Sequence, residues 1–135
     1  MVRECLIIKR SSEYSSIYNR AIGVDVETQE EIFAALCNKD KKFRDIVRRI
    51  LTQPNIYYDH YKKEKINERS RNISAMRFLD GDNTRIYCKE INDPTGTLIV
   101  ICAVALNKKV QRNDKKINAI IEKIVSYEYK IVEAY

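Results

Sequence analysis

The pattern of apolar and polar positions is most informative in the second half of the chain. Two strand-like runs, residues 73–79 and 84–91, are separated by the turn-forming residues 80–83. This arrangement predicts a β-hairpin. Residues 97–106 then form a continuous β-branched and aliphatic run, which is typical of a strand buried on both faces. We therefore expect this third strand to lie at the centre of a sheet.

A helix is predicted after the third strand. Asp114 can cap its N-terminus, and apolar residues follow at the spacing of one buried helical face. These apolar residues are Ile117, Ile120, Ile121, Ile124 and Val125.

The first half begins with a predicted short strand at residues 4–9. The four-residue spacing of Tyr14 and Tyr18 suits a helical face, and residues 28–31 have the form of a capping box for a helix that continues to about Asn38. Apolar residues recur at helical spacing behind this box, at Ile32, Phe33 and Leu36.

A second helix is predicted between Asp40, which can cap it, and Pro54, which bounds it. Its inward positions are Phe43, Ile46, Val47, Ile50 and Leu51, and its other surface carries Lys41, Lys42, Arg44, Arg48 and Arg49. A solvated basic face is the commoner explanation of such charges, but they could also bind phosphates or an acidic partner.

Together these signals predict the α+β class, with a small antiparallel β-sheet, N-terminal helices packed on it and a C-terminal helix. A chain of 135 residues has the size of one domain and can bury an ordinary core. We expect a single domain over residues 1–135, with a longer helical segment at about 38–71.

The charge balance favours polyanionic partners. Twenty-five Lys and Arg against nineteen Asp and Glu give a formal net charge of +6. Nucleic acid is the first candidate and an acidic protein is the second. The four cysteines include no Cys-x-x-Cys pair, and one histidine cannot complete a zinc site, so we expect reduced core thiols and no metal or cofactor.

The sequence also argues against two other classes. Three glycines leave no phosphate-binding loop or dinucleotide fingerprint. The longest apolar run, residues 98–106, is too short to span a membrane. We therefore expect no membrane partner and a cytoplasmic location.

Residues 55–71 interleave aromatic side chains with positive charge, a mixture that can stack on the bases of single-stranded RNA and neutralise its backbone. The same composition is common in a packed connecting segment. The predicted RNA-binding residues are Lys62, Lys63, Lys89, Arg44, Arg48 and Arg49. His60 is more often a surface or capping residue than a catalyst.

Cleavage of RNA suits a chain that is rich in Arg, Lys and Tyr. The substrate supplies its own nucleophile, the 2′-hydroxyl, so the protein needs a base, cations and a proton source. Strand alternation places Arg85, Tyr87 and Lys89 on one face, and Arg77 can join them if the hairpin register allows. The alternative is that these residues form the ordinary solvent side of a half-covered sheet.

A family resemblance adds to this interpretation. Met76-Arg-Phe, Arg85-Ile-Tyr, an aliphatic strand that ends at Lys108-Lys109, and a helix that closes on Tyr127 follow in that order. Over about the last 60 residues this order resembles the bacterial RelE/ParE toxin superfamily. The family's fold is a small antiparallel sheet with two N-terminal helices. The resemblance implies a site made of Arg77, Arg85, Lys108 and Lys109, with Tyr127 or Tyr129 near the C-terminal tyrosine found in some members. The predicted catalytic residues are these four with Tyr127, and Tyr87 from the strand alternation.

The resemblance implies the toxin of a toxin-antitoxin pair, an endoribonuclease that cuts mRNA, often on the ribosome, and that a cognate antitoxin protein inhibits. This sequence departs from the family in having Leu106-Asn107 where an aromatic residue usually precedes the lysine pair, and in its longer segment 38–71. Two alternatives stay open: a ParE-like toxin that inhibits DNA gyrase, and a non-catalytic module that binds nucleic acid or protein.

Overall fold

One seven-stranded sheet runs through the molecule in the computed structural model, which describes residues 2–64, 67–79, 83–107 and 114–133. The strands are β1 (Val2–Arg10), β2 (Arg20–Asp25), β3 (Tyr61–Lys63), β4 (Ile73–Arg77), β5 (Thr84–Asn92), β6 (Leu98–Asn107) and β7 (Glu128–Glu133). The helices are α1 (Gln29–Ala35), α2 (Asp40–Thr52) and α3 (Asp114–Val125), with 3-10 turns at Ser11–Tyr14 and Glu68–Ser70.

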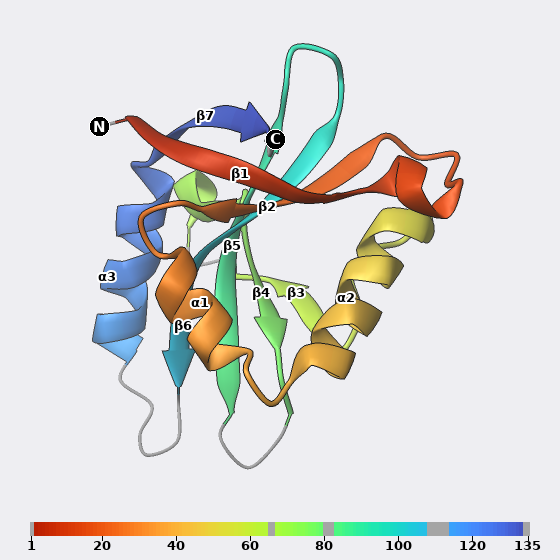
Figure 1. The fold of residues 1–135 in the computed structure, drawn as a ribbon. Helices are drawn as coiled ribbons and strands as arrows, with labels where there is room; N and C mark the ends of the chain where they lie inside the picture. Colours follow the sequence, from red (N-terminus) through yellow and green to blue (C-terminus); the bar gives the residue numbers. More distant parts are fainter. Residues whose placement is uncertain (1, 65–66, 80–82, 108–113, 134–135) are drawn as a thin grey trace.

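The order of the strands is β3-β4-β5-β6-β2-β1-β7 (Figure 1). The pairs β6/β2 and β1/β7 are parallel and the other pairs are antiparallel. The predicted α+β class and the predicted hairpin, β4 and β5, are confirmed. The third predicted strand, β6, lies fourth of seven, and its residues 99–103 are buried, as expected for a central strand with both faces covered.

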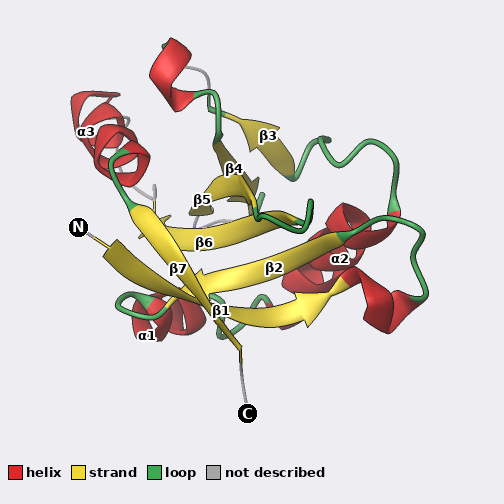
Figure 2. Cartoon of the chain, turned by 90° about the horizontal axis from the view of Figure 1, so that it is seen from above, coloured by secondary structure: helices red, strands yellow, loops and turns green. Residues whose placement is uncertain are grey.

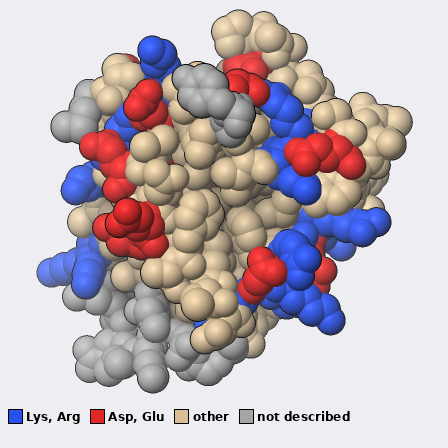
Figure 3. Space-filling model, viewed as in Figure 1, with Lys and Arg blue, Asp and Glu red and all other residues tan. Residues whose placement is uncertain are grey.

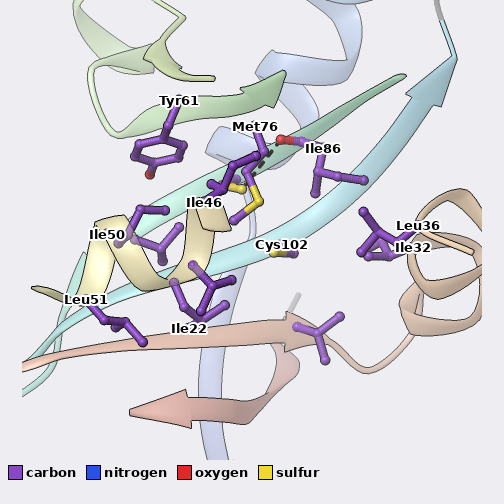
Figure 4. Close-up of a cluster of buried hydrophobic side chains, with 14 of the residues drawn as sticks. Ile22, Ile32, Leu36, Ile46, Ile50, Leu51, Tyr61, Met76, Ile86 and Cys102 are labelled. Atoms are coloured by element: carbon purple, nitrogen blue, oxygen red, sulfur yellow. Dashed lines mark hydrogen bonds between the residues drawn. The ribbon is translucent and has the colours of Figure 1, made fainter. Parts of the chain in front are cut away.

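Helices cover both faces of the sheet (Figures 1 and 2). The face below α1 and α2 holds the larger core cluster, in which Ile46 and Ile50 of α2 meet Ile22, Met76 and Ile86 of the sheet (Figure 4). The predicted inward face of α2 is confirmed, with Phe43 only partly buried. Its cationic side is exposed to solvent, apart from Arg49, which is partly buried.

The opposite face is covered by α3. Ile121 and Ile124 are buried there, and Ile117, Ile120 and Val125 are partly buried against the same cluster. The helix is not the last element, because β7 follows it and pairs parallel with β1. Among the described residues, no helix combines the length and apolar character needed to cross a membrane.

Several local expectations are corrected by the structure. Tyr14 and Tyr18 do not share a helix, because the 3-10 turn is followed by Ser15 at a φ of 55° and the chain then turns into β2. The capping box at residues 28–31 does not form. The Thr28 hydroxyl instead donates to the carbonyl oxygen of Ala103, at 2.6 Å, and so ties the start of α1 to the central strand.

The segment 38–71 is α-helical only over α2. The remainder contains an irregular stretch, β3 and one 3-10 turn. β3 forms the sheet edge next to β4, so this segment extends the sheet. Three of the cysteines, Cys5, Cys88 and Cys102, are buried free thiols, and Cys37 is exposed.

Candidate functional site

The two predicted arginines lie next to each other on the sheet. In the antiparallel pairing of β4 with β5, Arg77 is directly opposite Arg85. Both side chains point to the face covered by α3. Residues two apart in a strand lie on the same face, so Arg77 shares the face of Ala75 and Arg85 shares the face of Tyr87, and both Ala75 and Tyr87 belong to the cluster under α3. Their side chains are 23% and 21% exposed. The register that the sequence left open thus brings both cations to one partly buried place.

Glu64 joins these two arginines. Its Oε1 atom lies 3.4 Å from Nη2 of Arg77 and 3.3 Å from Nη1 of Arg85. The backbone N–H of Glu64 donates to the carbonyl oxygen of Ile73, at 2.9 Å, which continues the β3/β4 ladder past the end of β3. Like charges directly opposite each other destabilise a sheet. The carboxylate therefore offsets the repulsion between the two guanidinium groups.

Sequence reasoning missed Glu64. In the sequence, the one feature that distinguishes Glu64 is that it is the single acidic residue of the basic run 62–65. Its role becomes visible only when β3 pairs with β4.

A buried tyrosine lies beside the arginines. The Tyr87 side chain is fully buried, yet its hydroxyl has no hydrogen-bond partner among the described residues, and neither has Nε of Arg77. Burial raises the pKa of Tyr87, and the charge of Arg85 opposes this shift. The phenol therefore keeps its proton at neutral pH. A buried polar atom without a partner costs free energy, so these two atoms mark a place where a ligand could supply the missing bonds.

The remaining predicted catalytic residues are placed only in part. Lys108 and Lys109 lie outside the described residues. The last residue of β6, Asn107, pairs with Thr84, the neighbour of Arg85. Tyr127 is 8% exposed and belongs to the same cluster as Tyr87, and the guanidinium carbon of Arg3 lies 4.1 Å from its ring centroid.

Lys89 is bound to the end of α3. Its Nζ atom donates to the carbonyl oxygens of Val125, at 3.1 Å, and Tyr127. Burial lowers the pKa of Lys89, and the nearby charge of Glu128 opposes this shift. A cation at a helix C-terminus satisfies carbonyl groups that have no partner within the helix. The ammonium group predicted to bind RNA is therefore already engaged in holding α3.

The other predicted RNA-binding residues lie away from the arginine pair. Arg44 pairs with Asp40 at 3.0 Å, and the guanidinium carbons of Arg48 and Arg49 lie 5.7 and 4.2 Å from the ring centroids of Tyr14 and Tyr58. Their helix, α2, covers the sheet face opposite α3 (Figure 2). In Figure 3, Lys and Arg side chains lie on the α2 side of the molecule and also on the α3 side, with acids among them.

Lys62 and Lys63 belong to the edge strand β3. Lys62 is exposed. The Nζ atom of Lys63 donates to the carbonyl oxygen of Arg71, at 2.8 Å, and lies 3.6 Å from Oε1 of the buried Glu90. Of these two lysines, Lys62 is therefore the one that is presented to solvent without a partner among the described residues.

Within the described part of the chain, no three His, Cys, Asp or Glu side chains are grouped closely enough to hold a metal ion. A scan against protein-family models, a search of curated proteins and a search of solved structures find no match to this chain. The molecule is thus defined by its fold, an α+β domain built on a mostly antiparallel sheet, and by the cluster of Arg77, Arg85, Glu64 and Tyr87.

Proposed function

We propose that this protein is the toxin of a toxin-antitoxin pair and cleaves mRNA without a metal ion. The observation that carries the proposal is the convergence of Arg77 and Arg85 on one carboxylate, next to a buried tyrosine hydroxyl without a partner among the described residues. The element order β1, β2, α1, α2, β3, β4, β5, β6, α3, β7 supports it in part. It contains the strand, two helices, three strands and helix that the resemblance implies, but adds a second N-terminal strand, the edge strand β3 and the final strand β7.

The two arginines suit a phosphodiester group. Guanidinium groups form short, charge-assisted hydrogen bonds to phosphate oxygens, and these bonds strengthen as negative charge develops in the transition state. The Glu64 carboxylate occupies the position between them, so one anionic group can contact both arginines at once. When RNA binds, one of its phosphate groups would take the position between the two arginines, and the Glu64 carboxylate would lie next to that phosphate.

Glu64 and Tyr87 provide the proton transfers. The substrate 2′-oxygen forms a bond to phosphorus as its proton passes to Glu64. The bond from phosphorus to the 5′-oxygen breaks as that oxygen takes the proton of Tyr87, whose raised pKa keeps it protonated until then. After the product leaves, the proton passes from Glu64 back to the Tyr87 phenolate, which restores both groups. Lys108, Lys109 and Tyr127 are further proposed catalytic residues, on the strength of the resemblance.

The proposed partners follow from the same resemblance and from charge. The substrate is mRNA, free or on the ribosome, in the cytoplasm, and the inhibitor is a cognate antitoxin. The net charge of +6 favours an acidic antitoxin.

A transcriptome-wide map of RNA 5′ ends after brief induction in growing bacteria tests this proposal. The wild type should create new ends in coding regions, and the double variant Arg77→Gln/Arg85→Gln should not. The matched control is Arg69→Gln/Arg71→Gln, which removes the same charge from side chains that are 73% and 69% exposed. The control should create the same ends as the wild type.

Other outcomes assign the protein differently. Growth arrest without new RNA ends would replace the ribonuclease with a gyrase-type toxin. If the protein causes no growth arrest and creates no new RNA ends, the non-catalytic binding module is favoured. Thermal unfolding of each variant shows whether it is folded.

A further inference from the structure

A separate cavity is lined by residues at the start of α2, by His60 next to β3, and by the two residues that follow β4. Its volume is about 520 Å³, within the range of roughly 300 to 1,000 Å³ that small-molecule sites occupy. Its lining residues are Asn38, Lys39, Lys41, Lys42, Asp45, His60, Phe78 and Leu79. We call it the α2 cavity.

One wall of the α2 cavity is cationic. Lys41 and Lys42 are both exposed, and neither forms an ion pair within the described part of the chain. The arginines farther along α2 are partly engaged, by Asp40 or by tyrosine rings. The two lysines are therefore the cations of α2 that are most available to an incoming anion.

The facing wall is apolar and comes from the two residues that follow β4. Phe78 is buried at 2% exposure, whereas the neighbouring Leu79 is 66% exposed. An exposed leucine beside these two lysines leaves apolar surface uncovered next to positive charge. A ligand that covers both must carry a flat or apolar part and an anionic part.

His60 and Asp45 add polar groups of defined character. The Nδ1 atom of His60 lies 2.9 Å from the carbonyl oxygen of Arg77, which can only accept, so Nδ1 carries a proton and donates it. In the neutral ring this leaves Nε2 as an acceptor. The Asp45 carboxylate is a second acceptor, so the cavity can receive N–H or O–H donors from a ligand.

We infer that the α2 cavity binds a nucleotide unit. The base packs on Leu79 and donates to His60, the phosphate pairs with Lys41 and Lys42, and Asp45 accepts from a ribose hydroxyl. An acidic peptide would satisfy the lysines but would leave the apolar wall uncovered. The inference does not depend on RNA cleavage, since the α2 cavity and the arginine pair belong to different faces of the sheet.

The ligand can be a free nucleotide or one unit of a single strand. Two further grooves run along α2, with volumes of about 340 and 360 Å³. Lys42 and Asp45 also line the first groove, and Lys41 and Asp45 also line the second. Both grooves combine a tyrosine ring with Lys and Arg, a composition that suits neighbouring nucleotides of a strand.

Equilibrium binding to the 135-residue chain tests this inference. The ligands are uridine and adenosine monophosphate, inorganic phosphate, and a short 2′-O-methyl oligoribonucleotide, which lacks the free 2′-hydroxyl needed for cleavage. The test variants are Lys41→Ala/Lys42→Ala and Leu79→Ser. The matched control is Lys123→Ala/Lys130→Ala, which removes the same charge from positions on α3 and β7.

The lysine variant should bind the oligonucleotide more weakly, and the slope of its logarithmic salt dependence should fall by about 0.7 for each phosphate that the variant no longer neutralises. Leu79→Ser should weaken binding without changing that slope, and the control should bind like the wild type. Binding of the monophosphates above inorganic phosphate identifies a free nucleotide as ligand, whereas binding of the oligonucleotide alone identifies a strand.

Three results would overturn the inference. The first is unchanged binding by the lysine variant, and the second is an equal reduction of binding in the control. The third is a pair of observations: the monophosphates bind no more tightly than inorganic phosphate, and Leu79→Ser does not change binding of the oligonucleotide. Together they would show that the apolar wall contributes nothing to binding.

Discussion

Arg77 of β4 lies directly opposite Arg85 of β5, and the two guanidinium groups reach the same oxygen of Glu64 at 3.4 and 3.3 Å. Two like charges in register are unfavourable by themselves. Their position is therefore maintained by an internal anion, which a phosphate group of similar charge could replace.

Replacing Glu64 by glutamine should separate binding from cleavage. The variant loses the carboxylate that competes for the arginines, so a non-cleavable RNA should bind more tightly. Loss of the proposed base should lower the cleavage rate about 10²- to 10⁴-fold. Single-turnover cleavage and equilibrium binding measure the two effects.

The matched control is Glu68→Gln, at a side chain that is 87% exposed and pairs with Arg71. It should leave both quantities unchanged. Cleavage by Glu64→Gln at the wild-type rate would remove Glu64 from the mechanism.

Replacing Tyr87 by phenylalanine should impair cleavage without harming the fold. The lost hydroxyl has no partner among the described residues, so its removal should leave the free energy of unfolding unchanged or raise it by about 1 kcal/mol. Chemical denaturation and a cleavage assay on the same preparation test this. A large loss of stability would mean that the hydroxyl has a partner in the folded protein.

Tyr61→Phe provides the contrast. Tyr61 is equally buried, but its hydroxyl bonds to Ser74 at 2.6 Å and to Glu90. This variant should lower the free energy of unfolding by about 1 to 3 kcal/mol, because the buried Glu90 loses a donor.

Core truncations should act through stability alone. Ile101 of β6 and Ile121 of α3 are 0% and 1% exposed, and alanine at either position should cost about 2 to 5 kcal/mol of unfolding free energy. Ile17→Ala, at a position that is 90% exposed, should change it by less than about 0.5 kcal/mol. Urea unfolding gives all three values, and a cost as small at Ile101 as at Ile17 would contradict the placement of β6 in the core.

Stability should fall in alkaline solution through tyrosines that lie beside carboxylates. Burial and a hydrogen bond to Asp25 raise the pKa of Tyr129, and burial together with Glu90 raises the pKa of Tyr57 and Tyr61. An unfolded tyrosine ionises near pH 10. Because the folded pKa is higher, this stabilisation is fully present below about pH 10 and decreases as pH rises from there toward the folded pKa.

Denaturant unfolding between about pH 8 and 11 measures this dependence around the ordinary tyrosine pKa. Tyr129→Phe should lose stability less steeply above about pH 10 than the wild type. Its hydroxyl donates to Asp25 at 2.7 Å, so the variant should also be less stable at the lower end of this range. An unchanged alkaline slope would show that Tyr129 ionises equally easily in both states.

The elements that could be predicted from the sequence are those with a long, regular pattern. β1, β4, β5, β6, α1, α2 and α3 all follow runs that the sequence predicts as strands or helices. β2 was missed because it contains Gly23, a residue that usually weakens a strand. The folded protein requires glycine at position 23, because a Cβ atom there would lie 2.2 Å from Sγ of Cys5 and would collide with it.

β3 and β7 were missed for a related reason. β3 has three residues and β7 has six, with Lys and Glu among them, so neither has a distinctive pattern. Each becomes a strand only because an established neighbour offers backbone hydrogen-bonding groups: β4 for β3 and β1 for β7.

The sequence alone determined the α+β class, the central position of β6, the basic face of α2, and the common face of Arg85 and Tyr87, because these depend on local periodicity and on side-chain alternation. Only the tertiary structure decided that Arg77 lies opposite Arg85, that Glu64 joins them, and that Lys89 binds the end of α3. Strand register and contacts between distant segments depend on how whole surfaces pack, and no local pattern encodes them.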